Sequence, residues 1–165
     1  MGVTHRAVAE EAGVPLGATT YHFASKDDLI EAALRRSVDR YAAYLDDWVE
    51  QRPELTPEQL AVLLADALLG SFGPQRGRQV MEFELYVAAM RRPALRPLAD
   101  QYIERSVDAL SRYVDPLTAR AAAVAANGPT LRGLAGSEPP SRAETEGILR
   151  LILTARPDPS SPQGS

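Results

Sequence analysis

Few residues of this chain are of types that could do catalytic or metal chemistry. Cysteine is absent, and the two histidines are His5 and His22. Thiolate catalysis, zinc ribbons and disulfide scaffolds are therefore excluded, and a histidine-based metal cage or catalytic triad lacks its parts. Glu82 and Glu84 stand two apart on an expected helix, so their carboxylates point to different faces and cannot act as a paired acid and base. Because the sequence also has no Gly-rich phosphate loop and no nucleophile elbow, we expect a protein that is not an enzyme and has no metal or cofactor.

The stretch 4–28 has the residue types of two short helices joined by a tight turn. Such a pair needs a small residue where the helices cross, which Ala9 supplies, and a turn residue that tolerates positive φ, which Gly13 supplies. The apolar anchors of the inner faces would be Val8, Ala12 and Val14. The second helix would present short side chains and one aromatic ring, which can approach base edges in the DNA major groove. These side chains belong to Gly17, Ala18, Thr20 and Tyr21.

A longer string in the same region is more specific than this spacing. Residues 13–29 read GVPLGATTYHFASKDDL. This string resembles the signature of the TetR family of bacterial transcriptional regulators, roughly G-V-S-x-G-T-L-Y-x-H-F-x-S-K-x-x-L. The residues that match in register are Gly13, Val14, Gly17, His22, Phe23, Ser25, Lys26 and Leu29. The sequence departs from the signature at Ala18, Thr19 and Thr20. These differences affect which bases would be read, but they do not remove the motif.

The resemblance implies a dimeric, effector-responsive repressor with a helix-turn-helix unit. In such proteins the short helix pair enters the major groove, the following helices hold a small-molecule effector, and the last two helices pair with a second subunit. Thr4 matches the helix cap that contacts a phosphate, and Lys26 matches the phosphate-contacting lysine at the start of the next helix. The recognition-helix positions correspond to Gly17, Ala18, Thr20, Tyr21 and His22. A plainer alternative for His22 is that it packs beside Phe23 against the following helix.

Aromatic and methionine side chains form stripes at helical spacing. One stripe consists of Tyr41, Tyr44 and Trp48, and a later one of Phe83, Tyr86 and Met90. Such stripes are usually core, and the functional alternative is that they line one apolar pocket with a few polar tips. On that alternative we predict that an apolar, largely uncharged effector binds between the long helix from Ser25 and the helices around Phe83 and Tyr102. The predicted ligand-binding residues are Tyr44, Trp48, Phe83, Tyr86, Met90 and Tyr102.

Prolines, glycines and capping residues divide the rest of the chain into helix-length blocks, and no block alternates like a strand. The expected caps are Ser25 with Asp28, Thr56 with Gln59, Asp115 before Pro116, and Ser141 with Glu144. The expected helices cover about 25–51, 56 to 70–74, 75–91, a segment that ends near 114 with Pro93 and Pro97 at its first turn, 116–134 and 141–154. The sequence Asn127-Gly128-Pro129 is expected to interrupt the fifth of them. The sequence thus predicts an all-α protein: a partial helix-turn-helix unit over 1–36, a helical effector-binding and dimerisation domain over 37–155, and a disordered tail over 156–165.

The last two expected helices, about 116–134 and 141–154, carry more apolar side chains than a free surface would. These side chains belong to Val124, Leu131, Leu134, Ile148, Leu149 and Ile152. We therefore expect a homodimer that pairs through these two segments. No apolar run is long enough to span a membrane and no secretory segment begins the chain, so the expected location is the cytoplasm.

The helix that usually precedes this motif in the TetR family has no counterpart before Gly2. Within residues 1–26 the charges of Arg6 and Lys26 are balanced by those of Glu10 and Glu11, although phosphate neutralisation supplies much of the affinity for DNA. Two functions follow from these observations. The first is a DNA-binding repressor that a small apolar ligand releases from its operator. The alternative is a ligand-binding and dimerisation module that has lost effective DNA binding.

Overall fold

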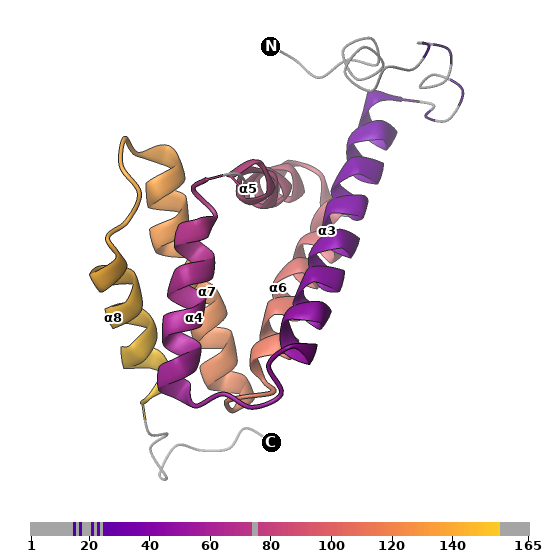
Figure 1. Ribbon diagram of the computed structural model, residues 1–165. Helices are drawn as coiled ribbons and strands as arrows, with labels where there is room; N and C mark the ends of the chain where they lie inside the picture. The colour runs from indigo at the N-terminus through magenta and orange to yellow at the C-terminus, as the bar shows by residue number, and fades with distance from the viewer. Residues whose placement is uncertain are drawn as a thin grey trace.

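The computed structural model describes residues 25–73 and 76–155, together with Pro15, Gly17, Tyr21 and Phe23. The predicted tail over 156–165 and most of the predicted helix-turn-helix unit lie outside the described residues. Within the described part every regular element is a helix, which confirms the all-α prediction (Figure 1). The elements are α3 (Lys26–Glu50), α4 (Pro57–Gly70), α5 (Arg76–Arg91), the short 3-10 helix η1 (Pro93–Leu95), α6 (Arg96–Leu110), α7 (Pro116–Ala135) and α8 (Arg142–Leu153).

Four helices begin at the capping residues that the sequence predicts, namely Ser25, Thr56, Asp115 and Ser141. The cap of α4 is a complete capping box. The backbone nitrogen of Gln59 donates to the Thr56 hydroxyl at 3.3 Å, and the backbone nitrogen of Thr56 donates to the Gln59 side chain at 2.9 Å. Each cap satisfies backbone donors that the first turn of a helix leaves without partners. The helix starts are therefore set by local sequence.

The predicted interruption of the fifth helix is wrong. Helix α7 is continuous from Pro116 to Ala135, with Pro129 inside it. Proline cannot donate to the carbonyl group four residues earlier, and its place in a helix interior costs about 3 kcal/mol. The neighbouring Thr130 hydroxyl donates to the Ala126 carbonyl at 2.7 Å, within the same turn of the helix. The packing of α7 against both α6 and α8 outweighs the local preference to break.

The helices surround two hydrophobic clusters that share α6. One cluster joins α4, α6, α7 and α8 and contains Leu60, Ala61, Ala65, Val107, Leu110, Ala119, Ala122, Ala123, Leu149 and Leu153. The other joins α3, α5, η1 and α6 and contains Leu34, Val38, Leu85, Ala89, Leu95, Leu98, Ala99 and Tyr102. Because α6 contributes to both clusters, it connects the two halves of the core.

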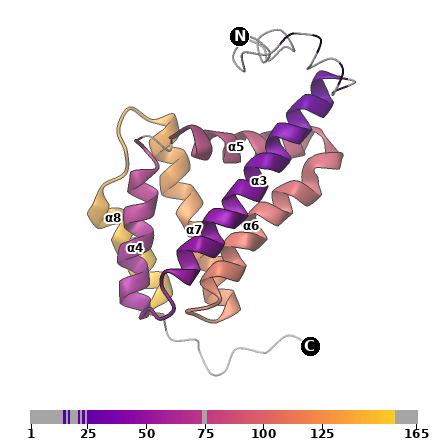
Figure 2. The same ribbon diagram turned by 45° about the vertical axis from the view of Figure 1, so that its right-hand side comes forward.

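Helix α3 lies alongside α6 in both views, and α5 crosses the bundle at the end where α3 begins (Figures 1 and 2). An ion pair fixes this corner, because Arg92, directly after α5, contacts the Asp27 carboxylate in the first turn of α3 at 2.6 Å. Helix α3 also runs without a break through the predicted boundary between residues 36 and 37. The two predicted units therefore share one helix.

None of the helices in the described ranges has the length and apolar character needed to cross a lipid bilayer.

Candidate functional site: an aromatic cavity beside helix α3

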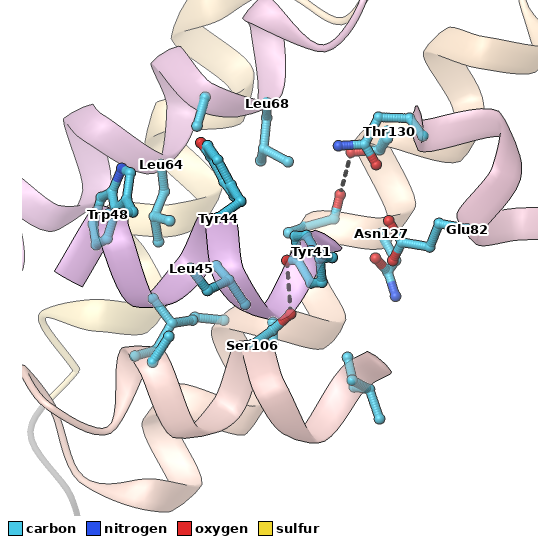
Figure 3. A pocket seen from close by; sticks show the side chains of 18 residues that line it. Tyr41, Tyr44, Leu45, Trp48, Leu64, Leu68, Glu82, Ser106, Asn127 and Thr130 are labelled. Carbon is cyan, nitrogen blue, oxygen red and sulfur yellow. Dashed lines mark hydrogen bonds between the residues drawn. The ribbon is translucent and has the colours of Figure 1, made fainter. Parts of the chain in front are cut away.

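A cavity of about 110 Å³ lies between α3, α4, α5, α6 and α7 (Figure 3). Helix α3 supplies its aromatic wall with Tyr41, Tyr44 and Trp48, and α4 and α6 supply mainly aliphatic side chains such as Leu64 and Ile103. Helix α7 contributes small or short residues, namely Ala122, Ala123, Ala126, Asn127 and Thr130. The cavity exists because the side chains of α7 on this side are small, and the bulky rings of α3 form its opposite wall. A site of this kind binds apolar molecules and orients them with a few polar groups.

The aromatic wall is held in place by contacts with neighbouring side chains. The rings of Tyr41 and Tyr102 are stacked, with centroids 4.2 Å apart and planes 4° apart. The Tyr41 hydroxyl shares a hydrogen bond of 2.8 Å with the Ser106 hydroxyl (Figure 3). At the other end of the wall, the Trp48 ring meets the edge of Tyr113 at a centroid distance of 6.0 Å, and the Arg52 guanidinium lies 4.8 Å from the centroid of the Trp48 ring. These contacts restrict the rotamers of the rings and keep one wall of the cavity preformed.

Polar side chains gather on the side of the cavity formed by α5 and α7. Glu82 is buried, with 9% of its surface exposed, and it points into the cavity region near Asn127 (Figure 3). Gln79, one turn earlier on α5, is also buried, and its side-chain nitrogen donates to the Ser71 hydroxyl at 2.9 Å. Ser71 in turn donates to the Ala67 carbonyl at 2.9 Å. A titratable side chain buried in the wall of a cavity is a candidate functional group.

Tyr86 lies one helical turn after Glu82 on α5. Its hydroxyl group is buried without a hydrogen bond of regular geometry. Burial raises the pKa of Tyr86 well above its ordinary value of 10.0, the charge of Glu82 raises this pKa further, and the Asn127 side chain opposes the shift. The phenol therefore stays neutral at physiological pH.

The six predicted ligand-binding residues occupy different places in the fold. Tyr44 and Trp48 line the cavity. Tyr86 and Tyr102 pack in the neighbouring aromatic cluster, with ring centroids 6.5 Å apart, and reach the cavity wall through Tyr41. The structure does not bring the other two residues to the cavity, because Phe83 lines a separate groove between α5 and α7 and Met90 is 76% exposed.

The prediction of the cavity residues missed the polar side of the site. From the sequence, Glu82 was excluded as half of a carboxylate pair; of its neighbours on the same face of α5, the prediction included Tyr86 but not Gln79. The signal was present, because Gln79, Glu82 and Tyr86 have i, i+3, i+7 spacing and so share one face of a helix. The polar residues of α7, Asn127 and Thr130, could not be assigned to the site while a break in that helix was expected.

The predicted DNA-binding residues are mostly outside the described part of the chain. Thr4, Ala18, Thr20 and His22 lie outside it. Gly17 and Tyr21 are described, and the Tyr21 side chain is 86% exposed. Lys26 is the first residue of α3, directly after the capping residue of that helix. The assignment of all seven residues to DNA binding stays a prediction.

Two family models match consecutive parts of the chain. Residues 2–33 match the model of bacterial regulatory proteins of the tetR family, and residues 55–155 match the model of the tetracyclin repressor-like C-terminal domain. No curated protein matches the chain. The first match includes the beginning of α3, and the second includes α4 to α8.

Solved structures resemble the whole fold. The protein SCO7518 from Streptomyces coelicolor A3(2) is 33% identical with a TM-score of 0.76, and the alignment covers 93% of this chain and 87% of that protein. SCO1917, a member of the TetR family from Streptomyces coelicolor A3, is 38% identical with a TM-score of 0.73, over 92% of this chain and 86% of that one. The multidrug binding protein EbrR, solved in complex with ethidium, is 39% identical with a TM-score of 0.74, over 92% and 87% of the two chains.

The second family model covers more than half of the chain, and the solved relatives align with over nine-tenths of it at more than 30% identity. Family membership implies a regulatory protein rather than an enzyme. The chain belongs to the TetR family of bacterial regulatory proteins, and it is a ligand-responsive transcriptional regulator.

Proposed function

We propose that the chain is a repressor that leaves its operator when an aromatic ligand enters the cavity beside α3. The observation that carries this proposal is the double role of α3. Its first residues belong to the match with the tetR regulatory model, which ends at residue 33, and its later residues Tyr41, Tyr44 and Trp48 line the cavity. One continuous helix of 25 residues therefore leads from the DNA-binding region to the ligand. Because a protein that binds operator DNA acts where the chromosome lies, this function belongs in the bacterial cytoplasm.

The size of the cavity limits what can bind without rearrangement. A cavity of about 150 Å³ accepts benzene, so the 110 Å³ here corresponds to roughly one aromatic ring. A larger ligand has to move part of the wall, and the rings that it would displace are those of Tyr44 and Trp48, which are half-buried. The similar protein EbrR was solved with imidazole, proflavin, ethidium and malachite green. We propose aromatic ligands of this range of sizes for this chain.

A ligand that moves the α3 wall has a direct route to the operator. Displacement of Tyr44 or Trp48 shifts the side of α3 that faces α4 and α6, and a rigid helix transmits such a shift along its length. Ligand binding and operator binding are thermodynamically linked. A ligand that weakens operator binding by a given factor must bind the operator-free protein more tightly than the operator-bound protein by the same factor. A large ligand that cannot fit without wall movement meets this condition.

The dimer surface that we propose is formed by α7 and α8. Leu117, Val124 and Leu131 are exposed by 77%, 58% and 50%, and their seven-residue spacing places them on one stripe of α7. Leu151 on α8 is 76% exposed. Exposed apolar stripes on two adjacent helices favour a four-helix arrangement with a second copy. Of the residues predicted for this surface, Val124 and Leu131 are exposed, whereas Leu149 is buried in the protomer's own core.

The proposed function can be tested with a labelled DNA fragment from the region beside the gene. We expect malachite green to release the wild-type protein from this fragment, as followed by fluorescence anisotropy. The matched control is Ala126→Leu, because Ala126 lines the cavity and a larger side chain there fills it. The variant should bind the fragment as the wild type does and resist release.

Two outcomes would contradict the proposal. If the dye released wild type and variant equally, it would act on the DNA rather than through the cavity. If the wild-type protein bound the fragment no better than unrelated DNA, the chain would be a ligand-binding module without operator binding.

A further inference from the structure

We propose that ligands reach the cavity through a surface pocket between α3 and α4, the entrance pocket, and that Arg52 is a positioning residue that holds the Trp48 ring across it. The inference rests on the proposed function, in which the cavity is the effector site. It adds a second site, at which a ligand meets the outer side of the aromatic wall before that wall opens. The residues that line the entrance pocket include Asp47, Gln51, Arg52, Leu63 and Asp66.

The entrance pocket and the cavity share one wall. Tyr44, Trp48 and Ala67 line both spaces, so the two rings separate the cavity from the pocket outside it. In Figure 3 the side chains of Tyr44 and Trp48 lie beside Leu64 of α4. The entrance pocket has a volume of about 390 Å³, which is within the range of small-molecule sites. A ligand held there reaches the cavity when the rings of Tyr44 and Trp48 move aside.

Side chains rather than closely packed helices fill the space between α3 and α4. Helix α3 packs closely on α6 and α4 packs closely on α8, whereas α3 and α4 do not pack closely against each other. The α4 side is fixed, because Leu60 lies in the core cluster that joins α4 to α8 and Asp66 forms an ion pair with Arg142 of α8. The movable part of this wall is therefore the pair of half-buried rings on α3.

A second surface pocket, between α3 and α6, also borders the cavity. Leu45 and Ala109 line both of these spaces. Opening this side would pull α3 away from α6, on which it packs closely. It would also separate Tyr41 from the ring of Tyr102 and from the hydroxyl of Ser106. The side between α3 and α4 opens by rotation of side chains rather than by separation of packed helices, so the observations favour it as the entrance.

Arg52 covers the Trp48 ring on the side of the entrance pocket. Arg52 lines this pocket and is not among the described residues that line the cavity. Its guanidinium lies 4.8 Å from the centroid of the Trp48 ring and donates a hydrogen bond of 3.1 Å to the Trp48 carbonyl. The backbone of Arg52 is held as well, because the Tyr113 hydroxyl donates to its carbonyl at 2.6 Å. A cation on the face of the ring opposes rotation of the ring, so loss of the guanidinium should lower the barrier to opening.

The experiment measures the rates of ligand binding as well as the affinity. The probe is ethidium, whose own fluorescence reports binding, and association and dissociation are followed by stopped flow without DNA. A residue that acts only at the entrance changes both rates by the same factor, so the dissociation constant stays the same. We expect Arg52→Met to raise both rates about two- to fivefold. Arg52→Lys keeps a cation near the ring and should raise them less.

A second variant should change the rates in the opposite direction. Leu63 lines the entrance pocket and is not among the described residues that line the cavity, so Leu63→Trp obstructs the entrance alone. Both rates should fall at least about fivefold, because the larger side chain has to be displaced. Ala42→Trp and Arg105→Met are the matched controls, since both residues line the pocket between α3 and α6. These controls should keep the wild-type rates, and a thermal melt verifies that each variant is folded.

The outcomes separate the inference from the proposed function. If Arg52→Met or Leu63→Trp leaves the rates unchanged, or if the controls change them instead, the inference is overturned and the cavity can still be the effector site. If either test variant changes the dissociation constant as much as the rates, its residue belongs to the binding site, and the inference is overturned as well. If ethidium does not bind the wild type, or if Ala126→Leu leaves its affinity unchanged, the proposed effector site is overturned and the inference falls with it.

Discussion

Tyr41 joins α3 to α6 at two points. Its ring lies 4.2 Å from the ring of Tyr102, centroid to centroid, and its hydroxyl shares a hydrogen bond of 2.8 Å with Ser106, one turn further along α6. The same side chain lines the cavity. A ligand that pushes on Tyr41 therefore acts on the joint between the helix that leads to the DNA-binding region and the helix that connects both parts of the core.

Truncation of Tyr102 should destabilise the protein strongly. Only 2% of this side chain is exposed, and Tyr102→Ala removes a buried ring together with its stack on Tyr41. We expect a loss of about 3–5 kcal/mol in the free energy of unfolding, measured with urea. Tyr102→Phe keeps the ring and should lose far less. A loss below about 1 kcal/mol for the alanine variant would show that the stack does not hold α3 against α6.

Ligand binding should change the fluorescence of Trp48, the single tryptophan of the chain. Its ring lines the cavity while Arg52 and Tyr113 contact it. An aromatic ligand that stacks on the ring or displaces it should quench the emission or shift its maximum in a saturable way. Trp48→Phe should abolish the signal while dialysis still detects the ligand. Unchanged emission at full occupancy would place the ligand elsewhere.

The helix starts could be predicted from the sequence because capping is a local interaction. Ser25 and Thr56 each bind a backbone nitrogen three residues ahead, so the signal and the structure lie within one turn. Pro129 shows the limit of such local reasoning. A local rule predicts a break there, but the contacts of α7 with α6 and α8 come from distant segments and outweigh it.

The cavity could be predicted only in part. Periodicity shows which residues share one face of a helix, but it does not show which other helix or cavity that face contacts. The stripe of Tyr44 and Trp48 on α3 does line the cavity, whereas Phe83 faces a groove of its own. The reason is the crosswise path of α5, which turns different faces of that helix toward the cavity and the groove (Figure 2). Glu82 lies on the cavity side and Phe83, the next residue, on the other.

Two glycines of α7 should respond in opposite ways to alanine. A Cβ atom at Gly133 would lie 2.6 Å from atoms of both Phe72 and Pro140, so Gly133→Ala forces the loop after α4 away and should cost about 1–3 kcal/mol. At Gly128 the same change meets nothing within 4 Å and should stabilise the helix by up to about 1 kcal/mol. Thermal melts of the two variants check this. Equal effects would contradict the close approach of Phe72 to α7.

A charge on the apolar stripe of α7 should disrupt the proposed dimer. Val124 is 58% exposed in the middle of the stripe, and Val124→Glu would bury a carboxylate between two copies. We expect sedimentation at micromolar concentration to show a dimer for the wild type and a monomer for this variant. Met90→Glu is the control, because Met90 is 76% exposed on α5, away from the stripe. If this control dissociated and Val124→Glu did not, the interface would lie on α5.

The cap of α7 should make a pH-dependent contribution to stability. The Asp115 carboxylate accepts hydrogen bonds from the backbone nitrogens of Leu117 at 3.0 Å and Thr118 at 3.1 Å. Hydrogen bonding, first of all from Thr118, lowers the pKa of Asp115 below its ordinary value of 3.8. The folded state therefore favours the charged carboxylate. The resulting stabilisation is complete above the unfolded pKa and is lost as the pH falls through the lower, folded pKa.

Two substitutions separate the cap from its charge. At pH 7 we expect Asp115→Ala to lower the free energy of unfolding by about 1 kcal/mol, and Asp115→Asn, which keeps an accepting oxygen, to lower it by much less. Urea unfolding between pH 7 and about pH 3 checks the sign, because the difference between wild type and Asp115→Ala should shrink only below about pH 4. A difference that stayed constant over this range would show that the protonated carboxyl group of Asp115 caps the helix as well as the charged carboxylate does. In that case the lowered pKa of Asp115 would have no counterpart in the stability of α7.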